Sequence, residues 1–229
     1  FLYTDKIKTD GGAPTPTEAR VRRMEFIGDS YTVGYGNLDH DGTHTSEVPA
    51  YTDSWQSYAS IAARAFDADA NLIASSGKGL YANLIGFTSQ KTMVWNYDYA
   101  DYWQDDTTTK WDFSSYTPQV VVIFLGTNDY AGTSGSMGSE FYWAYCDFIA
   151  KIRDHYPNAH IICCSKSENC YGGEAERAVE NAGGAANRVY YLQFADFGAS
   201  AIHGHPNVTE HDAIARQLVD KINQIEDVW

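Results

Sequence analysis

The sequence is poor in positive charge and has no long apolar run. Its 229 residues include 16 Lys and Arg against 30 Asp and Glu, which gives a formal net charge of −14. Such an acidic chain repels the phosphates of nucleic acid and anionic membrane surfaces, so we expect neither as a partner. No stretch approaches the roughly 20 apolar residues of a membrane-spanning helix, and we expect no membrane anchor. A neutral substrate such as a sugar is compatible with this charge, although the charge does not select one.

Cysteine is also scarce, with four residues at positions 146, 163, 164 and 170. Their spacing matches no zinc-binding pattern, and we predict neither a metal site nor a cofactor. Cys163 and Cys164 lie inside an apolar, strand-like run, which favours buried free thiols. A disulfide from one of these two residues to Cys170 is the alternative.

The first residues differ in composition from the rest of the chain. Residues 9–17 are rich in Gly, Pro and Thr, which supply turns but no packing face. We therefore predict an N-terminal segment and linker over residues 1–17 and one folded domain over residues 18–229. The chain begins at Phe1 with neither an initiator Met nor an apolar signal segment, so we expect a processed piece of a longer protein.

Strand-like and helical patterns alternate along the folded part. Short apolar runs predict strands at 21–27, 70–74, 119–125, 159–164 and 189–194, and apolar periodicity predicts helices at 54–66, 139–155, 174–182 and 208–225. This alternation predicts an α/β fold, a three-layer α/β/α sandwich around a parallel sheet of about five strands. Residues 91–117 show no period, and we expect a surface excursion held down by Trp95, Trp103 and Trp111.

Polar stretches follow three of the predicted strands. The first strand runs into Gly28, Asp29 and Ser30, where glycine permits a sharp turn and the serine stands at the mouth of the next loop. Ser-Gly-Lys-Gly at 76–79 follows the second strand, and Gly-Thr-Asn-Asp at 126–129 follows the third. The carboxyl ends of parallel strands share one edge of the sheet, so we expect these stretches to converge.

These stretches contain the groups that acyl transfer requires. The Ser30 hydroxyl becomes a nucleophile when a base such as His205, which precedes the last helix, removes its proton. An oxyanion could be stabilised by the backbone N–H groups of Ser30 and Gly77 and the side-chain amide of Asn128. Taken singly, each residue also fits a turn or a helix cap, and Asp29 is expected to hydrogen-bond its own turn. The combination and order favour a catalytic site.

The combination resembles the SGNH, or GDSL-type, hydrolases, which have a flavodoxin-like fold, and the resemblance covers most of residues 21–229. Their four named residues would be Ser30, Gly77, Asn128 and His205. Finer motifs resemble carbohydrate esterase family 2, whose members deacetylate plant polysaccharides. These motifs are Glu-Phe-Ile-Gly-Asp-Ser at 25–30, Gly-Tyr-Gly-Asn at 34–37, Ser-Gly-Lys-Gly-Leu at 76–80, Trp-Asp-Phe-Ser at 111–114, and residues 126–129.

The resemblance implies a serine esterase that removes O-acetyl groups from acetylxylan or glucomannan outside the cell. In that family a β-sandwich domain precedes the hydrolase domain, and residues 1–17 are too short to form one. We therefore expect that domain to be absent or removed, and the chain to belong to a larger multidomain protein. Tyr31, Tyr130 and Trp143 are candidates for stacking against sugar rings, although aromatic residues at helical spacing also fit a core.

One departure from the SGNH pattern concerns the group that orients the histidine. Most of these enzymes carry an aspartate two or three residues before it, where this chain has Ile202 and His203. The nearest upstream acid is Asp196, which would have to fold back on a tight loop. We therefore predict a Ser–His dyad whose imidazole is oriented by a backbone carbonyl just before His205.

Two other functions fit the same motifs. An SGNH lipase or thioesterase would act on longer acyl chains and would need an apolar groove. A polysaccharide-binding module on this fold would have lost its activity, although the intact set of four residues argues against that loss.

Overall fold

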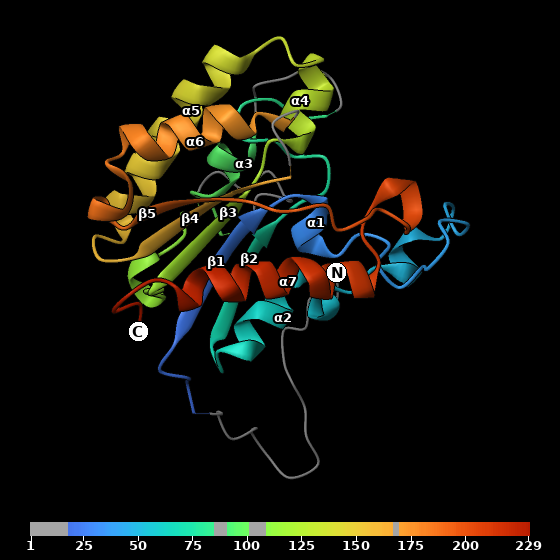
Figure 1. Ribbon diagram of the computed structural model, residues 1–229, viewed down its shortest axis with the longest axis horizontal. Coiled ribbons are helices and arrows are strands. Elements are labelled where there is room, and N and C mark those ends of the chain that lie inside the picture. The colour runs from blue at the N-terminus through green and yellow to red at the C-terminus, as the bar shows by residue number, and fades with distance from the viewer. Residues whose placement is uncertain (1–17, 85–90, 101–108, 167–169) are drawn as a thin grey trace.

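The computed structural model in Figure 1 describes residues 18–84, 91–100, 109–166 and 170–229. Five strands form one all-parallel sheet with the order β2-β1-β3-β4-β5. The strands are β1 (Arg23–Gly28), β2 (Asp69–Ala74), β3 (Val120–Phe124), β4 (His160–Ser165) and β5 (Val189–Gln193). The predicted α/β architecture with its parallel sheet is confirmed. The predicted segment and linker at 1–17 lie outside the described residues.

Helices cover both faces of the sheet (Figure 1). The α-helices are α1 (Ser30–Val33), α2 (Tyr58–Ala65), α3 (Met93–Asn96), α4 (Thr127–Thr133), α5 (Gly138–His155), α6 (Gly172–Asn181) and α7 (Val208–Asn223). Short 3-10 turns lie at Val48–Tyr51, Ser54–Gln56, Phe113–Ser115, Gly184–Asn187 and Ile202–Gly204. Helices α2 and α7 lie on one face, and α5 and α6 lie on the other.

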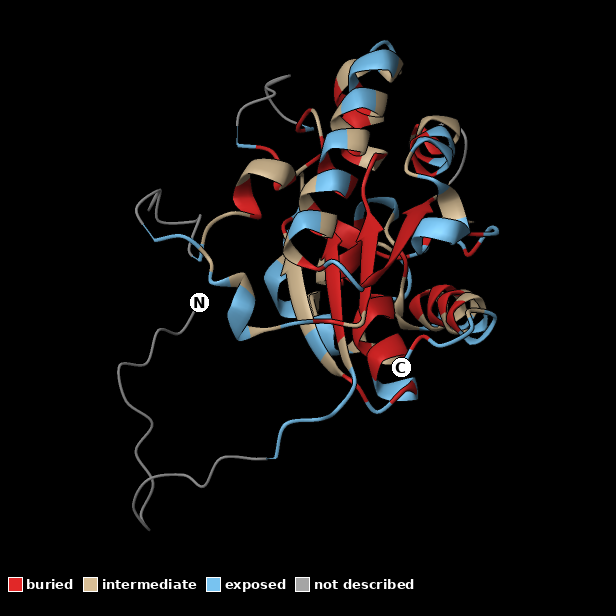
Figure 2. Ribbon diagram, turned by 90° about the vertical axis from the view of Figure 1, so that its left-hand side faces the viewer, coloured by how far each residue is buried: buried red, intermediate tan, exposed pale blue. Residues whose placement is uncertain are grey.

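Strand β3 is buried on both sides because its residues alternate between two cores. Val122 and Phe124 pack with α2 and α7, whereas Val121 and Ile123 pack with α5 and α6. A strand covered by helices on both faces has no polar face, which explains its unbroken apolar sequence. Figure 2 shows buried strands at the centre of the sheet, while the covering helices expose their outer sides.

One carboxylate breaks the apolar character of the sheet. Glu25 on β1 is fully buried and accepts hydrogen bonds from Tyr97 Oη (2.7 Å), Asn71 Nδ2 (3.0 Å) and Tyr156 Oη (3.2 Å). Burial raises the pKa of Glu25, and these three bonds oppose the rise. A buried polar group is tolerated where its hydrogen bonds are satisfied, as they are here.

The helix predicted at 54–66 is interrupted. Asp53 accepts a hydrogen bond from the Trp55 N–H (2.9 Å), which closes a short 3-10 turn, and extended Ser57 separates that turn from α2. The Trp55 side chain is consequently 63% exposed instead of lying on the core face, and it packs under the Arg64 guanidinium. The other predicted strands and helices begin and end within a few residues of the observed bounds.

The expected surface excursion at 91–117 contains α3 and the turn at Phe113–Ser115. Trp95 packs against Tyr99 with ring centroids 4.5 Å apart, and buried Tyr97 packs on Phe148 of α5. Trp103 lies outside the described residues. The excursion is therefore attached to the α5 face of the sheet.

All four cysteines are described, and none forms a disulfide. Cys163 and Cys164 are buried in β4 as expected of free thiols, whereas Cys146 and Cys170 are only partly buried. None of the helices in the described part of the chain is long and apolar enough to cross a bilayer.

Candidate active site

The turn after β1 presents a serine at the carboxyl edge of the sheet. A Cβ on Gly28 would lie 2.0 Å from Thr32 Oγ1, so the close approach of α1 to β1 requires glycine at this position. Asp29 caps α1 by accepting a hydrogen bond from the Tyr31 N–H (3.1 Å), which confirms its expected role in the turn. Ser30 is the first residue of α1, and 9% of its surface is exposed.

His205 lies beside Ser30 although the two residues are far apart in the sequence. Its Nε2 is 2.8 Å from Ser30 Oγ, and its Nδ1 is 3.0 Å from the backbone carbonyl of Ile202. A carbonyl only accepts, so Nδ1 carries the proton and Nε2 turns its lone pair toward the hydroxyl. Burial lowers the pKa of His205, and the bond to Ile202 partly offsets this effect. The neutral imidazole can accept the serine proton.

The nearest upstream acid does not reach this imidazole. Asp196 is exposed and accepts a hydrogen bond from the Gly198 N–H (3.2 Å) of its own loop. His203 has a left-handed backbone (φ 53°), and its Nδ1 is 3.0 Å from Tyr35 Oη. The acceptor for His205 is thus a main-chain group, which sequence motifs do not record.

The other two predicted residues follow the strands on either side of β1. Gly77, after β2, has φ 79°, and its N–H makes no hydrogen bond with any other described residue. Asn128 lies in the first turn of α4 after β3, and its Nδ2 donates to the Lys78 carbonyl (2.9 Å) and to Asp29 Oδ2 (3.2 Å). The Asn128 amide therefore joins the loop after β2 to the Asp29 cap beside Ser30.

The carboxyl group of Asp29, next to Ser30, has an unusual pKa. Its side chain is fully enclosed, and burial raises its pKa to about 7. The hydrogen bond from Tyr31 opposes this rise, and the nearby Asp129 carboxylate adds to it. Near neutral pH this carboxyl group next to Ser30 is thus partly protonated.

The three aromatic candidates occupy different environments. Tyr31 is 4% exposed and stacks on Phe124 at 5.4 Å, with the His205 ring 5.5 Å away, so it packs beneath the site and offers little surface to a sugar. Tyr130 follows Asp129 on α4 and remains partly exposed. Trp143 is 62% exposed and lies on the outer side of α5, opposite the buried face.

Two residues near the site were not among the predicted site residues, although Tyr35 lies in the Gly-Tyr-Gly-Asn motif at 34–37. Lys166 follows β4, and its Nζ lies 3.1 Å from Tyr31 Oη. The ring of Tyr35 lies 4.5 Å from that of His205, centroid to centroid. Both positions depend on how separate loops meet at the carboxyl edge, and single-sequence patterns do not specify that.

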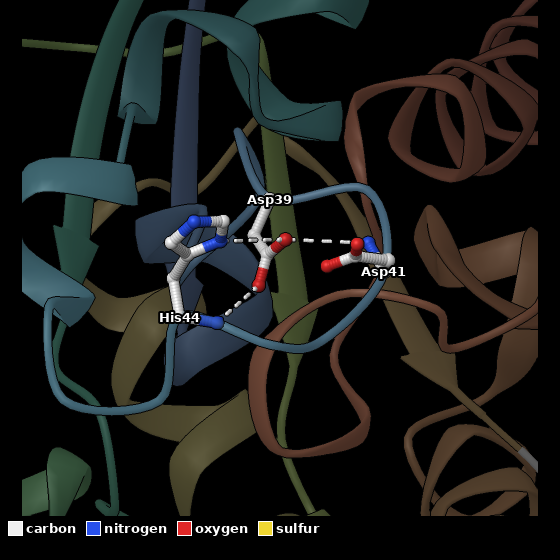
Figure 3. A group of neighbouring side chains, drawn as sticks. All are labelled: Asp39, Asp41 and His44. Atoms are coloured by element: carbon white, nitrogen blue, oxygen red, sulfur yellow. Dashed lines mark hydrogen bonds and ion pairs between the residues drawn. The ribbon is translucent and has the colours of Figure 1, made fainter.

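One group of potential metal ligands occurs among the described residues, in the loop after α1. Ligand atoms of Asp39, Asp41 and His44 lie within 4.8 Å of one another (Figure 3). The Asp39 carboxylate accepts hydrogen bonds from the backbone N–H groups of Asp41 and His44, both at 3.2 Å. Burial would raise the pKa of Asp39, but these bonds outweigh it and lower the pKa to about 2. The carboxylate thereby holds the turn together.

A serine hydrogen-bonded to a histidine at the carboxyl edge of a parallel sheet is an arrangement typical of serine hydrolases, and comparison with known proteins agrees. Residues 26–223 match the GDSL-like lipase/acylhydrolase family, to which the chain belongs. The predicted resemblance to SGNH hydrolases, and within them to family 2 carbohydrate esterases, is confirmed by this match and by the relatives.

The individual relatives are longer proteins. The chain is 37% identical over 222 residues to the cellulase/esterase CelE of Acetivibrio thermocellus, covering 92% of this chain and 26% of CelE. It is 29% identical over 242 residues to an acetylxylan esterase/glucomannan deacetylase of Cellvibrio japonicus, covering 100% of this chain and 65% of that protein. The chain thus spans about a quarter of the length of CelE and about two thirds of the length of the Cellvibrio japonicus protein.

Among solved structures, the chain is similar to a family two carbohydrate esterase from Clostridium thermocellum in complex with cellohexaose. The sequence identity is 33% and the TM-score is 0.81, covering 94% of this chain and 68% of the solved chain. The α/β fold described above is therefore that of family 2 carbohydrate esterases.

Proposed function

We propose that this chain is a serine esterase that removes O-acetyl groups from acetylated plant cell-wall polysaccharide. The observation that carries the proposal is the 2.8 Å hydrogen bond between Ser30 Oγ and His205 Nε2, with Nδ1 bonded to the Ile202 carbonyl. Ser30 acts as nucleophile and His205 as general base and acid. The backbone N–H groups of Ser30 and Gly77 stabilise the oxyanion, together with the Asn128 amide, which gives up its longer bond to Asp29 Oδ2 (3.2 Å) for this purpose.

The reaction proceeds in two halves. Ser30 Oγ attacks the acetyl carbonyl while His205 Nε2 takes the hydroxyl proton, giving a tetrahedral oxyanion. Collapse expels the sugar oxygen, which receives that proton, and leaves an acetyl group on Ser30. Water then attacks the acetyl-enzyme with His205 again as base, and acetate leaves. The oxyanion donors matter most while the negative charge is present.

The substrate class follows from the relatives. The Cellvibrio japonicus protein is called an acetylxylan esterase/glucomannan deacetylase, and the Clostridium thermocellum esterase was solved with cellohexaose. We propose acetylxylan or glucomannan as the substrate here. Tyr130, which remains partly exposed on α4, is the aromatic residue best placed among our three candidates to contact it. Trp143 would contact only a chain that crosses α5.

Saccharide binding without turnover is a second candidate function, favoured by the cellohexaose complex of that relative, since cellohexaose carries no acetyl group. In our proposal both functions use the site around Ser30 and His205. We further propose that the chain acts outside the cell as part of a larger multidomain protein, because polysaccharide cannot enter the cell and both curated relatives are longer.

A series of p-nitrophenyl esters, measured beside acetylated xylan and acetylated glucomannan, tests the proposal. The acetate ester should be cleaved fastest, with kcat/KM falling from acetate to butyrate and octanoate, and acetate should be released from at least one polymer. Ser30→Ala should abolish both activities. Rates that rise toward octanoate would instead indicate the lipase-like alternative, and binding of the polymers without acetate release would indicate a binding module.

A further inference from the structure

Asp129 is a buried carboxylate next to the site that the proposed chemistry leaves without a role. It lies in the first turn of α4, directly after Asn128, and is 1% exposed. Oδ2 accepts a hydrogen bond from the Leu80 N–H (2.9 Å), and Oδ1 accepts from the N–H groups of Tyr81 (2.6 Å) and Ala82 (2.8 Å). One side chain thus binds three consecutive backbone donors.

These donors belong to the loop that carries Gly77. The same loop is held a second time, because Asn128 Nδ2 donates to the Lys78 carbonyl (2.9 Å). We define the oxyanion loop as residues 77–82. Asn128 and Asp129, two successive residues of α4, therefore bind four consecutive peptide groups of this loop. The loop is also closed by the Leu84 N–H, which donates to the Gly77 carbonyl (2.9 Å), and by the Gly79 N–H, which donates to Asn83 Oδ1 (3.2 Å).

The fit between the carboxylate and the loop is tight. A Cβ on Gly79 would lie 2.6 Å from Asp129 Oδ2 and 1.9 Å from the Ala82 carbonyl oxygen. Glycine at position 79 is consequently required for the loop to wrap around the carboxylate. Burial raises the pKa of Asp129, and the three N–H bonds oppose that rise.

We propose that Asp129 is a positioning residue that holds the oxyanion loop so that the Gly77 N–H and the Asn128 amide converge on one oxyanion. The inference rests on the proposed esterase function. Oxyanion donors act through preorganisation, and a displacement of about 1 Å can cost on the order of a hundredfold in rate. Loosening the loop should therefore lower kcat, whereas the ground-state ester, which places little demand on these donors, should keep its KM.

The test is Asp129→Asn, assayed with p-nitrophenyl acetate beside a matched control, Glu25→Gln. Glu25 is likewise fully buried and accepts three hydrogen bonds, but from side chains within the sheet and its α5 face. We expect Asp129→Asn to lower kcat by about tenfold to a hundredfold with KM changed by less than about threefold. Glu25→Gln should lower the urea midpoint while kcat stays within about threefold of wild type.

Gly79→Ala disturbs the same contact from the loop side and serves if Asp129→Asn does not fold. It should also lower kcat more than KM. Wild-type kcat in a folded Asp129→Asn or Gly79→Ala variant would overturn the inference, as would an equal kcat loss in Glu25→Gln. Ser30→Ala separates the two proposals: if it stays active, the esterase assignment fails, whereas an inactive Ser30→Ala beside a fully active Asp129→Asn overturns only the positioning role.

Discussion

At the scale of single residues, the site depends on a carbonyl where many hydrolases use a carboxylate. The Ile202 carbonyl at 3.0 Å holds the His205 tautomer, and the nearest upstream acid, Asp196, bonds within its own loop. A backbone carbonyl accepts the same hydrogen bond as an aspartate without adding a negative charge beside the imidazole. The dyad therefore requires no particular side chain at positions 202 and 203.

This arrangement predicts different effects for two substitutions. Asp196→Ala should keep most of kcat, because its carboxylate does not contact the imidazole. His205→Ala should lose nearly all of kcat, because no other base lies within hydrogen-bond distance of Ser30 Oγ in the described part of the chain. Steady-state kinetics on p-nitrophenyl acetate decides the matter. A loss beyond about a hundredfold in Asp196→Ala, with an unchanged circular dichroism spectrum, would mean that a triad operates.

The pH profile is a second prediction at this scale. Burial lowers the pKa of His205 below its ordinary value of 6.5, so the imidazole stays neutral, and competent as a base, at pH values where a free histidine is protonated. The acidic limb of kcat/KM for p-nitrophenyl acetate should therefore have its midpoint below about pH 6.5. A midpoint above that value would contradict the environment described for His205.

At the scale of elements, the strands and most helices could be predicted from the sequence, whereas the turns and hydrogen bonds that connect separate segments could not. Each apolar run became a strand because the buried centre of a parallel sheet imposes one strong pattern. The break before Tyr58 was missed because the Asp53 side chain closes a local turn inside an otherwise helical pattern. For the site, the loops that carry Ser30, Gly77 and Asn128 follow strand ends and could be found from the sequence. The hydrogen bonds that Asp129 and Lys166 make join segments that are far apart in the sequence, so no local motif records them.

The closing helix gives a prediction at the same scale. Asn207 accepts a hydrogen bond from the Glu210 N–H (3.0 Å), and Glu210 accepts from the Asn207 N–H (2.8 Å), which forms a capping box at the start of α7. Asn207→Ala should lower the free energy of unfolding by about 1 kcal/mol. Urea denaturation measures this change. An unchanged midpoint would show that the cap contributes no stability. In that case the packing of the apolar face of α7 on the sheet would alone hold the helix in place.

At the scale of the whole molecule, buried carboxyl groups make stability depend on pH. The pKa of Asp29 is about 7 in the folded chain against an ordinary value of 3.8. Its contribution to stability is fully present below its unfolded pKa and is lost as the pH rises through about 7, because the unfolded chain releases the proton first. Glu25, whose pKa is also raised, acts in the same direction.

In Asp29→Asn the unfolding free energy should therefore decrease less between about pH 4 and pH 7 than in wild type, because one of the groups that titrates in this range is absent. Urea midpoints measured across this range at constant ionic strength give the slope. The same series on Glu25→Gln should weaken the slope in the same direction, because the pKa of Glu25 is also raised. A slope identical to wild type in Asp29→Asn would mean that Asp29 ionises normally in the folded protein.

The most direct test of the central claim is to trap the acetyl group on the enzyme. Rapid acid quench of the protein with p-nitrophenyl acetate, followed by peptide mass spectrometry, should find one acetyl group on the peptide that contains Ser30. The modification should disappear in Ser30→Ala and persist longer in His205→Ala that has been acetylated slowly, because deacylation needs the same base. Turnover with no acetyl on Ser30, or with the acetyl on another residue, would contradict the account.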